Sequence, residues 1–142
     1  MWNLALVLAV AAEAASSEAL ASRRATCTVL GVASPQASET RRQFSATRVI
    51  DLEFVLSTRR GAALPLALKV FTPNGYLYET LLPQLVPSSQ GRGGERGRLT
   101  ARLPVAGTAI LTSSLYGRWS VVPYLQGDVD ACGPPLAFWI GP

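Results

Sequence analysis

The sequence predicts an all-β domain, a single antiparallel β-sandwich of seven or eight short strands that follows an N-terminal signal helix. Apolar and polar residues alternate at a spacing of two in several segments, as in strands with one buried face. Proline, glycine and asparagine punctuate the chain between these segments. The 142 residues, 49% of them hydrophobic, are enough for one domain with a sizeable core. A small closed barrel is the competing architecture.

The first segment has the pattern of a secretion signal. Leu4–Ala12 is an unbroken apolar run of nine residues, which is too short to cross a membrane as a helix. Such a run is typical of a signal peptide, and small residues at Ala19 and Ala21 offer a cleavage site. We therefore expect residues 1–21 to be a signal peptide and residues 22–142 the domain. Met1–Asn3 has no Lys or Arg, and a short helix of the folded domain is the alternative.

The two cysteines support export. Cys27 and Cys132 both lie in the expected domain, one near each end. A single pair predicts one disulfide that joins the first strand to the last, in an oxidising compartment, either the periplasm or the exterior. The alternative is a pair of buried thiols that never meet.

The segment Leu103–Leu125 is expected to organise the core. It reads as two short strands with a corner at Ser113–Gly117, and Ile110 is placed in the first strand. In the second strand, Trp119 and every second residue after it share one face. Trp119 is the largest apolar group on that face, and we take it as the centre of the core.

The same alternation predicts the remaining strands. They are Ala25–Val32, Ala46–Ser57, Leu64–Phe71, Tyr76–Leu82, Leu99–Leu103 and Leu136–Ile140. Thr72–Gly75 has the Pro-Asn-Gly chemistry of a tight turn and predicts a hairpin. Residues 83–98 hold two prolines and four glycines and are expected to form a long flexible loop.

The clearest alternation, in Ala46–Ser57, separates two sets of side chains. The set expected to face the core is Ile50, Leu52, Phe54 and Leu56. Asp51 and Glu53 point the other way. Paired carboxylates can hydrolyse glycosides, but nothing nearby in the sequence would make one of them the acid and the other the base, and we interpret them as the solvated face of an amphipathic strand.

The sequence predicts no catalytic residues and no cofactor. The chain contains no histidine, which removes the usual general base and the commonest zinc ligand. Lys69, the only lysine, is expected to point to solvent from a strand. Asp128 and Asp130 are weak metal candidates because two carboxylates in one turn are a fragment of a calcium site; an ordinary turn is the alternative.

The net charge of +4 is scattered rather than gathered on one element. An Arg-Gly segment at Gly91–Arg98 is similar to single-strand nucleic-acid binders, but it contains no aromatic residue for base stacking. We therefore expect no nucleic-acid partner and no transmembrane segment.

Three tyrosines are candidate binding residues. Tyr76 and Tyr78 are expected on one face of their strand and Tyr124 on an outward face opposite Trp119. Tyrosines of this kind combine a large apolar area with a polar tip, which suits protein or sugar partners. The alternative is that they pack against neighbouring elements.

One short motif resembles a known type of domain. Leu115–Val121 (Leu-Tyr-Gly-Arg-Trp-Ser-Val) is similar to the penultimate strand of bacterial secreted immunoglobulin-like and fibronectin-like domains, and a Gly-x-Trp step also occurs in jelly-roll domains of secreted proteases. The resemblance implies an immunoglobulin-like sandwich and carries no activity. The sequence departs from antibody-type domains because its two cysteines are too far apart for a bridge between central strands.

These observations together predict a non-enzymatic exported β-sandwich that acts as a protein-binding or envelope-assembly module. Its expected partner is a protein or another component of the cell envelope. The second hypothesis is a carbohydrate-binding module that uses the surface tyrosines.

Overall fold

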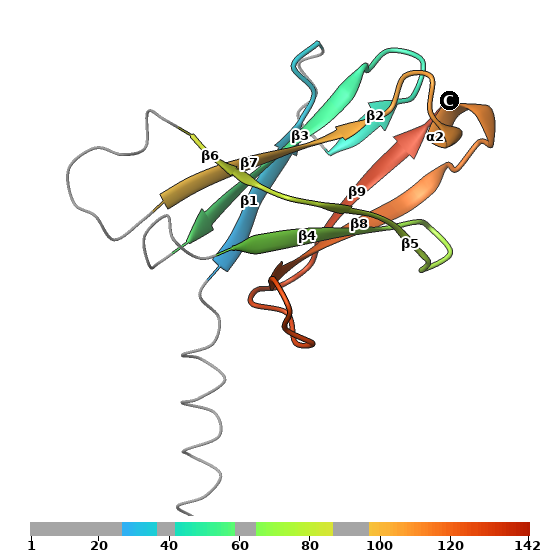
Figure 1. Cartoon of the computed structure of the whole chain (residues 1–142). Coiled ribbons are helices and arrows are strands. Elements are labelled where there is room, and N and C mark those ends of the chain that lie inside the picture. Colours follow the sequence, from blue (N-terminus) through green and yellow to red (C-terminus); the bar gives the residue numbers. More distant parts are fainter. Residues whose placement is uncertain (1–26, 37–41, 59–64, 87–96) are drawn as a thin grey trace, which may run out of the picture.

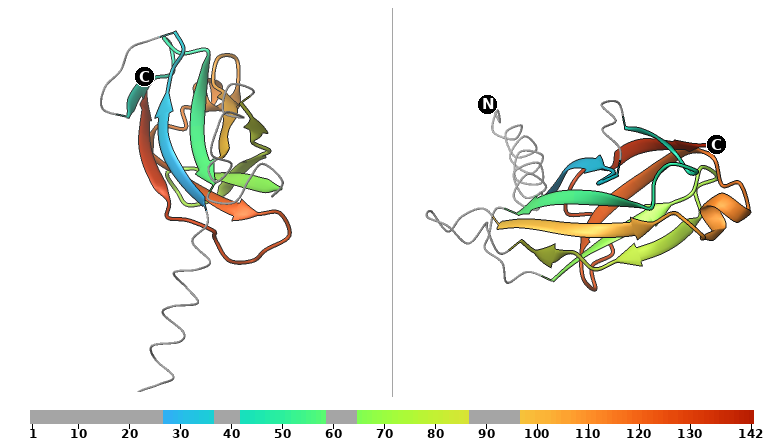
Figure 2. Two further views of the ribbon diagram at one scale, coloured as in Figure 1. Left: turned by 90° about the vertical axis from the view of Figure 1, so that its left-hand side faces the viewer. Right: turned by 90° about the horizontal axis from the view of Figure 1, so that it is seen from above.

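The computed structural model describes residues 27–36, 42–58, 65–86 and 97–142. Within these ranges the chain forms two β-sheets that face each other as layers (Figures 1 and 2). The elements are β1 (Cys27–Ala33), β2 (Gln43–Ser45), β3 (Asp51–Thr58), β4 (Leu66–Phe71), β5 (Leu77–Leu81), β6 (Gln84–Leu85), β7 (Gly97–Pro104), α2 (Ala109–Thr112), β8 (Gly117–Leu125) and β9 (Leu136–Gly141). This arrangement confirms the all-β sandwich. The expected signal peptide lies outside the described residues.

The smaller sheet has the order β1-β3-β7-β6 and is antiparallel throughout. In β3 every second residue is buried, as the sequence alternation predicts. Leu52 and Leu56 pair with Leu103 and Leu99 of β7, so the inward face of this sheet is built from directly opposed aliphatic pairs.

The larger sheet has the order β2-β9-β8-β4-β5. The predicted hairpin is present: β4 pairs antiparallel with β5, the amide of Gly75 donates to the carbonyl of Thr72 at 2.9 Å, and Gly75 has a φ of 84°. A left-handed residue at this point suits glycine, which has no Cβ to clash.

Trp119 lies at the centre of the core, as expected. It is fully buried, its indole stacks near Phe138 with ring centroids 6.3 Å apart, and Tyr78 meets it edge-on at 5.2 Å. The indole N–H donates to the carbonyl of Leu115 at 2.9 Å. The one polar group of the side chain therefore has a partner inside the core, as buried donors require.

The expected strand around Ile110 is wrong, because Ile110 lies in the short helix α2. The hydroxyl of Thr108 caps this helix by accepting from the amide of Ile110 at 3.3 Å. Ile110 is still fully buried. The helix therefore buries the side chain that the strand was expected to bury.

The expected strand Ala46–Ser57 begins too early, since β3 starts at Asp51. The amides of Arg48 and Val49 both donate to the carbonyl of Ser45, which makes a turn before the strand. The alternation of buried and exposed side chains therefore does not extend into this turn. Ile50 is 59% exposed and does not belong to the set of side chains that face the core.

Two further short strands were not predicted. β2 pairs in parallel with β9, and β6 pairs with β7 inside the segment expected to be the loop 83–98. Only Leu82 and Pro83 separate β5 from β6, so this stretch passes from one sheet to the other (Figure 1). The expected loop is therefore too long at both ends, because β7 begins at Gly97. Residues 87–96 lie outside the described residues.

The predicted disulfide between Cys27 and Cys132 is present, across a sequence separation of 105 residues. Cys132 lies in the connection between β8 and β9 rather than in the last strand itself. The bond ties the first residue of the smaller sheet to the larger sheet. Backbone hydrogen bonds extend the join: Cys27 N donates to Cys132 O at 3.3 Å, and Cys132 N donates to Pro123 O at 2.9 Å.

Gly133 packs so tightly beside this bond that a side chain has no room there. A Cβ at this position would clash with the backbone carbonyl oxygen of Cys27. We expect Gly133→Ala to lower the free energy of unfolding by about 1–3 kcal/mol, measured by urea denaturation, because the backbone must shift to relieve the overlap. Gly31→Ala is the matched control, since a Cβ there meets nothing within 4 Å. Equal urea midpoints for the two variants would contradict the prediction.

Candidate functional site

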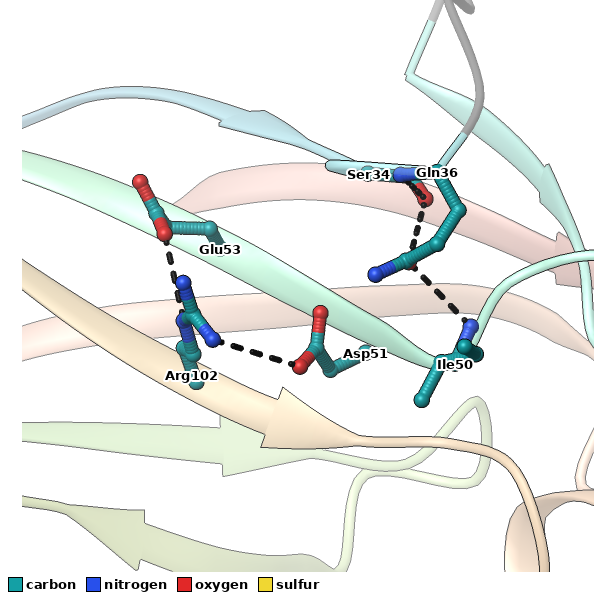
Figure 3. A network of polar contacts seen from close by, with 6 residues as sticks. All are labelled: Ser34, Gln36, Ile50, Asp51, Glu53 and Arg102. Atoms are coloured by element: carbon teal, nitrogen blue, oxygen red, sulfur yellow. Dashed lines mark hydrogen bonds and ion pairs between the residues drawn. The ribbon is translucent and has the colours of Figure 1, made fainter.

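Asp51 and Glu53 lie on the outer face of the smaller sheet, where Arg102 of β7 reaches both (Figure 3). Arg102 Nε donates to Glu53 Oε2 at 3.2 Å, and Arg102 Nη1 lies 3.7 Å from Asp51 Oδ2. Glu53 and Arg102 are direct cross-strand partners. The two carboxylates thus form an ion-pair network on a strand surface, in keeping with the solvated-face interpretation.

A second polar contact in Figure 3 joins the end of β1 to the start of β3. The side-chain oxygen of Gln36 accepts from the hydroxyl of Ser34 at 3.2 Å and from the amide of Ile50 at 3.3 Å. These contacts hold the chain in place where β3 begins. They do not involve the carboxylates of Asp51 and Glu53, which pair with Arg102.

The three candidate tyrosines lie in different surroundings. Tyr76 precedes β5 and is 72% exposed, whereas Tyr78 turns inward and packs on Trp119. Tyr124 lies on the outer face of the larger sheet, with the ammonium of Lys69 4.4 Å from its ring centroid. The structure does not bring the three rings onto one surface.

Asp128 and Asp130 are both exposed in the turn that follows β8. The amide of Asp128 donates to the carbonyl of Leu125 at 3.0 Å, and Gly127 has a φ of 86°, so the local geometry is that of a tight turn. Within the described residues, no group of three or more His, Cys, Asp or Glu side chains could hold a metal ion.

Strand β5 has exposed apolar side chains at both of its ends, and among the described strands only β4 pairs with it. It is the last strand of the larger sheet. Tyr76, Leu77 and Leu82, at the two ends of this strand, are 72%, 53% and 63% exposed. We call these three residues and the backbone of Leu77–Leu81 the β5 edge.

The opposite end of the same sheet holds a groove beside Trp139 on β9. The groove has a volume of about 570 Å³. It is lined by Gln43, Phe44, Ser45, Tyr116, Gly117, Trp139, Ile140, Gly141 and Pro142. Trp139 is 41% exposed, which is a large exposed fraction for a tryptophan. We call this hollow the Trp139 groove.

An adjoining hollow of about 420 Å³ lies on the other side of Arg118. Its lining includes Thr72, Pro73, Arg118, Ser120 and Ala137. The guanidinium of Arg118, which lines this hollow, lies 5.8 Å from the ring centroid of Trp139, which lines the Trp139 groove.

Trp139 is not among the binding residues predicted from the sequence, although the sequence contains a signal for it. Leu136–Ile140 was expected to be a strand, and its alternation puts Trp139 on the face opposite Phe138. A tryptophan on the outward face of a strand is an unusual exposure of apolar area and therefore a candidate contact.

No family model, curated protein or solved structure matches the chain. In the described ranges, no helix has the length and hydrophobicity that a membrane crossing requires.

Proposed function

We propose that the chain is a non-enzymatic, exported β-sandwich of the immunoglobulin-like type that binds a protein partner in envelope assembly. The strand orders support this fold type: β1-β3-β7-β6 and β4-β8-β9 correspond to the A-B-E-D and C-F-G sheets of that architecture. The Cys27–Cys132 disulfide supports export because such bonds persist in oxidising compartments.

The observation that carries the proposal is the β5 edge. An edge strand presents backbone N–H and C=O groups to which another extended segment can add. Here the free edge coincides with three large exposed apolar side chains, Tyr76, Leu77 and Leu82. Single exposed apolar residues are ordinary, whereas a group along one edge is typical of a contact surface. The partner would supply an extended segment with apolar side chains.

The test compares two leucine-to-lysine variants on edge strands. Leu77→Lys charges the β5 edge, and Leu30→Lys charges β1, the edge strand of the other sheet, at a leucine of similar exposure. In pull-downs from envelope extract, we expect Leu77→Lys to reduce the recovered partner at least about tenfold, since burial of a leucine contributes roughly 1.5–3 kcal/mol.

Hydrogen exchange in the presence of the recovered partner then locates the contact. The amides of residues 77–81 should become protected while those of 27–33 stay unchanged. Equal recovery with both variants, or equal loss with both, would reject the β5 edge as the binding surface.

Carbohydrate binding remains the second candidate function. The candidate tyrosines give it little support, because Tyr78 packs on Trp119 and Tyr124 lies on the other face of the sheet. The observation that favours it is the Trp139 groove.

A further inference from the structure

The indole of Trp139 is flanked by polar side chains from both neighbouring strands. Gln43 of β2 and Arg118 of β8 are its direct cross-strand partners. The backbone around the ring is fixed as well, because Trp139 N donates to the carbonyl of Arg42 at 2.8 Å. The exposed aromatic ring therefore sits on a rigid strand between an amide and a guanidinium, which is the kind of support that a binding site needs.

Gly141 is one of the residues that line the groove beside this ring. A Cβ at Gly141 would meet nothing within 4 Å, so the space above this residue is empty of protein. Ser45 borders the groove, and its hydroxyl donates to the carbonyl of Pro142 at 3.1 Å. The hollow of about 570 Å³ is shallow and open, and it combines the Trp139 ring with the polar side chains of Gln43 and Ser45.

One charged side chain, Arg118 of the second hollow, lies beside the Trp139 ring. Among the described residues that line the two hollows, Arg118 is the only charged side chain. Within the same described ranges, the salt bridges involve Arg102 on the other sheet, and Arg118 pairs with the Trp139 ring instead. The Arg118 guanidinium has a planar array of N–H donors, which can bind a carboxylate through two parallel hydrogen bonds.

We infer that the Trp139 groove binds a carbohydrate chain that carries carboxylates, such as a polyuronide. A sugar ring has a flat apolar face that can lie on the exposed indole and hydroxyls at its rim that can bond to the side-chain amide of Gln43. The carboxylate of the same or the next ring pairs with Arg118. An acidic peptide would satisfy the guanidinium but offers no comparable ring for Trp139. Trp139 on β9 is separated from the β5 edge by β8 and β4, although the hollow at Arg118 reaches the turn that precedes Tyr76. The sugar site does not depend on the protein-binding proposal.

The test uses a tetrasaccharide of galacturonic acid and its carboxyl-reduced, neutral counterpart, titrated calorimetrically into the full chain. We expect Arg118→Gln to weaken binding of the acidic tetrasaccharide about tenfold or more and to leave the neutral one unchanged, because a hydrogen-bonded charge pair is lost. Trp139→Ala should weaken both. Lys69→Gln is the matched control, since it removes the other cation–π pair of the sheet at Tyr124, and it should change neither.

Arg118 is exposed, so Arg118→Gln should fold normally. Thermal unfolding checks that Trp139→Ala is also folded. The inference is overturned if the acidic tetrasaccharide does not bind, or if Arg118→Gln binds it as tightly as the wild type. It is also overturned if a glutamate peptide of equal charge binds as tightly, because the indole then has no role. Variants of the β5 edge should bind the sugar normally, which keeps the two proposals separable.

Discussion

Replacing Trp119 by alanine is expected to lower the free energy of unfolding by about 3–5 kcal/mol. The side chain is fully buried between Phe138 and Tyr78, so its removal loses apolar contacts and leaves a cavity. It also leaves the carbonyl of Leu115 without the donor that it has in the wild type. Since domains of this size have about 5–15 kcal/mol of stability, the loss should be a large part of the total. Urea denaturation followed by circular dichroism measures the change.

Two variants separate the contributions of Trp119. Trp119→Phe keeps much of the apolar ring but has no N–H for Leu115, so it should fall between the wild type and alanine. Trp139→Ala is the positional control, because this indole is 41% exposed on the outer face and loses less buried area. If Trp119→Ala and Trp139→Ala shifted the urea midpoint equally, Trp119 would not be the centre of the core.

The sequence was a good guide wherever one local rule determines the backbone. The alternation in β3, which continues through Leu52, Phe54 and Leu56, has the expected buried face. The turn at Thr72–Gly75 forms because proline and glycine fix its dihedral angles locally. Trp119 could be placed in the core because no other side chain in its strand removes as much apolar area from water.

The sequence was a poor guide where the burial of a side chain does not determine the conformation of its backbone. Ile110 is buried, but an isolated buried aliphatic residue fits a helix turn as well as a strand. Ile50 continues the apolar spacing of β3 in the sequence, yet the turn at Ser45–Val49 places it in solvent. β2 has only three residues and exists because β9 lies beside it, so its pairing depends on tertiary structure that a local pattern does not contain.

The tyrosines show the same limit at the candidate site. Tyr76 and Tyr78 would share a face in a regular strand, but the register of β4 with β5 shifts between Val70 and Phe71. Val70 pairs with Glu79 and Phe71 with Leu77, which leaves Tyr78 as the extra residue of a bulge. The bulge breaks the alternation, and the Tyr78 ring packs on Trp119. Trp139, by contrast, lies in an unbroken strand whose alternation was sufficient to place it outward.

The double variant Cys27→Ser and Cys132→Ser is expected to lower the free energy of unfolding by about 2–5 kcal/mol. The bond closes a loop of 105 residues, and in the chain-entropy model a loop of about 100 residues contributes up to roughly 4.7 kcal/mol by restricting the unfolded chain. The bond also anchors β1, an edge strand that pairs only with β3 in its sheet. Thermal and urea unfolding of the double variant and the wild type measure the difference.

Reduction of the wild type distinguishes the missing bond from the substituted side chains. Both cysteines are buried, so the serine hydroxyls add a desolvation cost of their own. With a strong reductant, the wild-type midpoint should fall toward that of the double variant, while the double variant should not respond. A wild type whose stability is unchanged by reduction would mean that the sheets hold together without the bond.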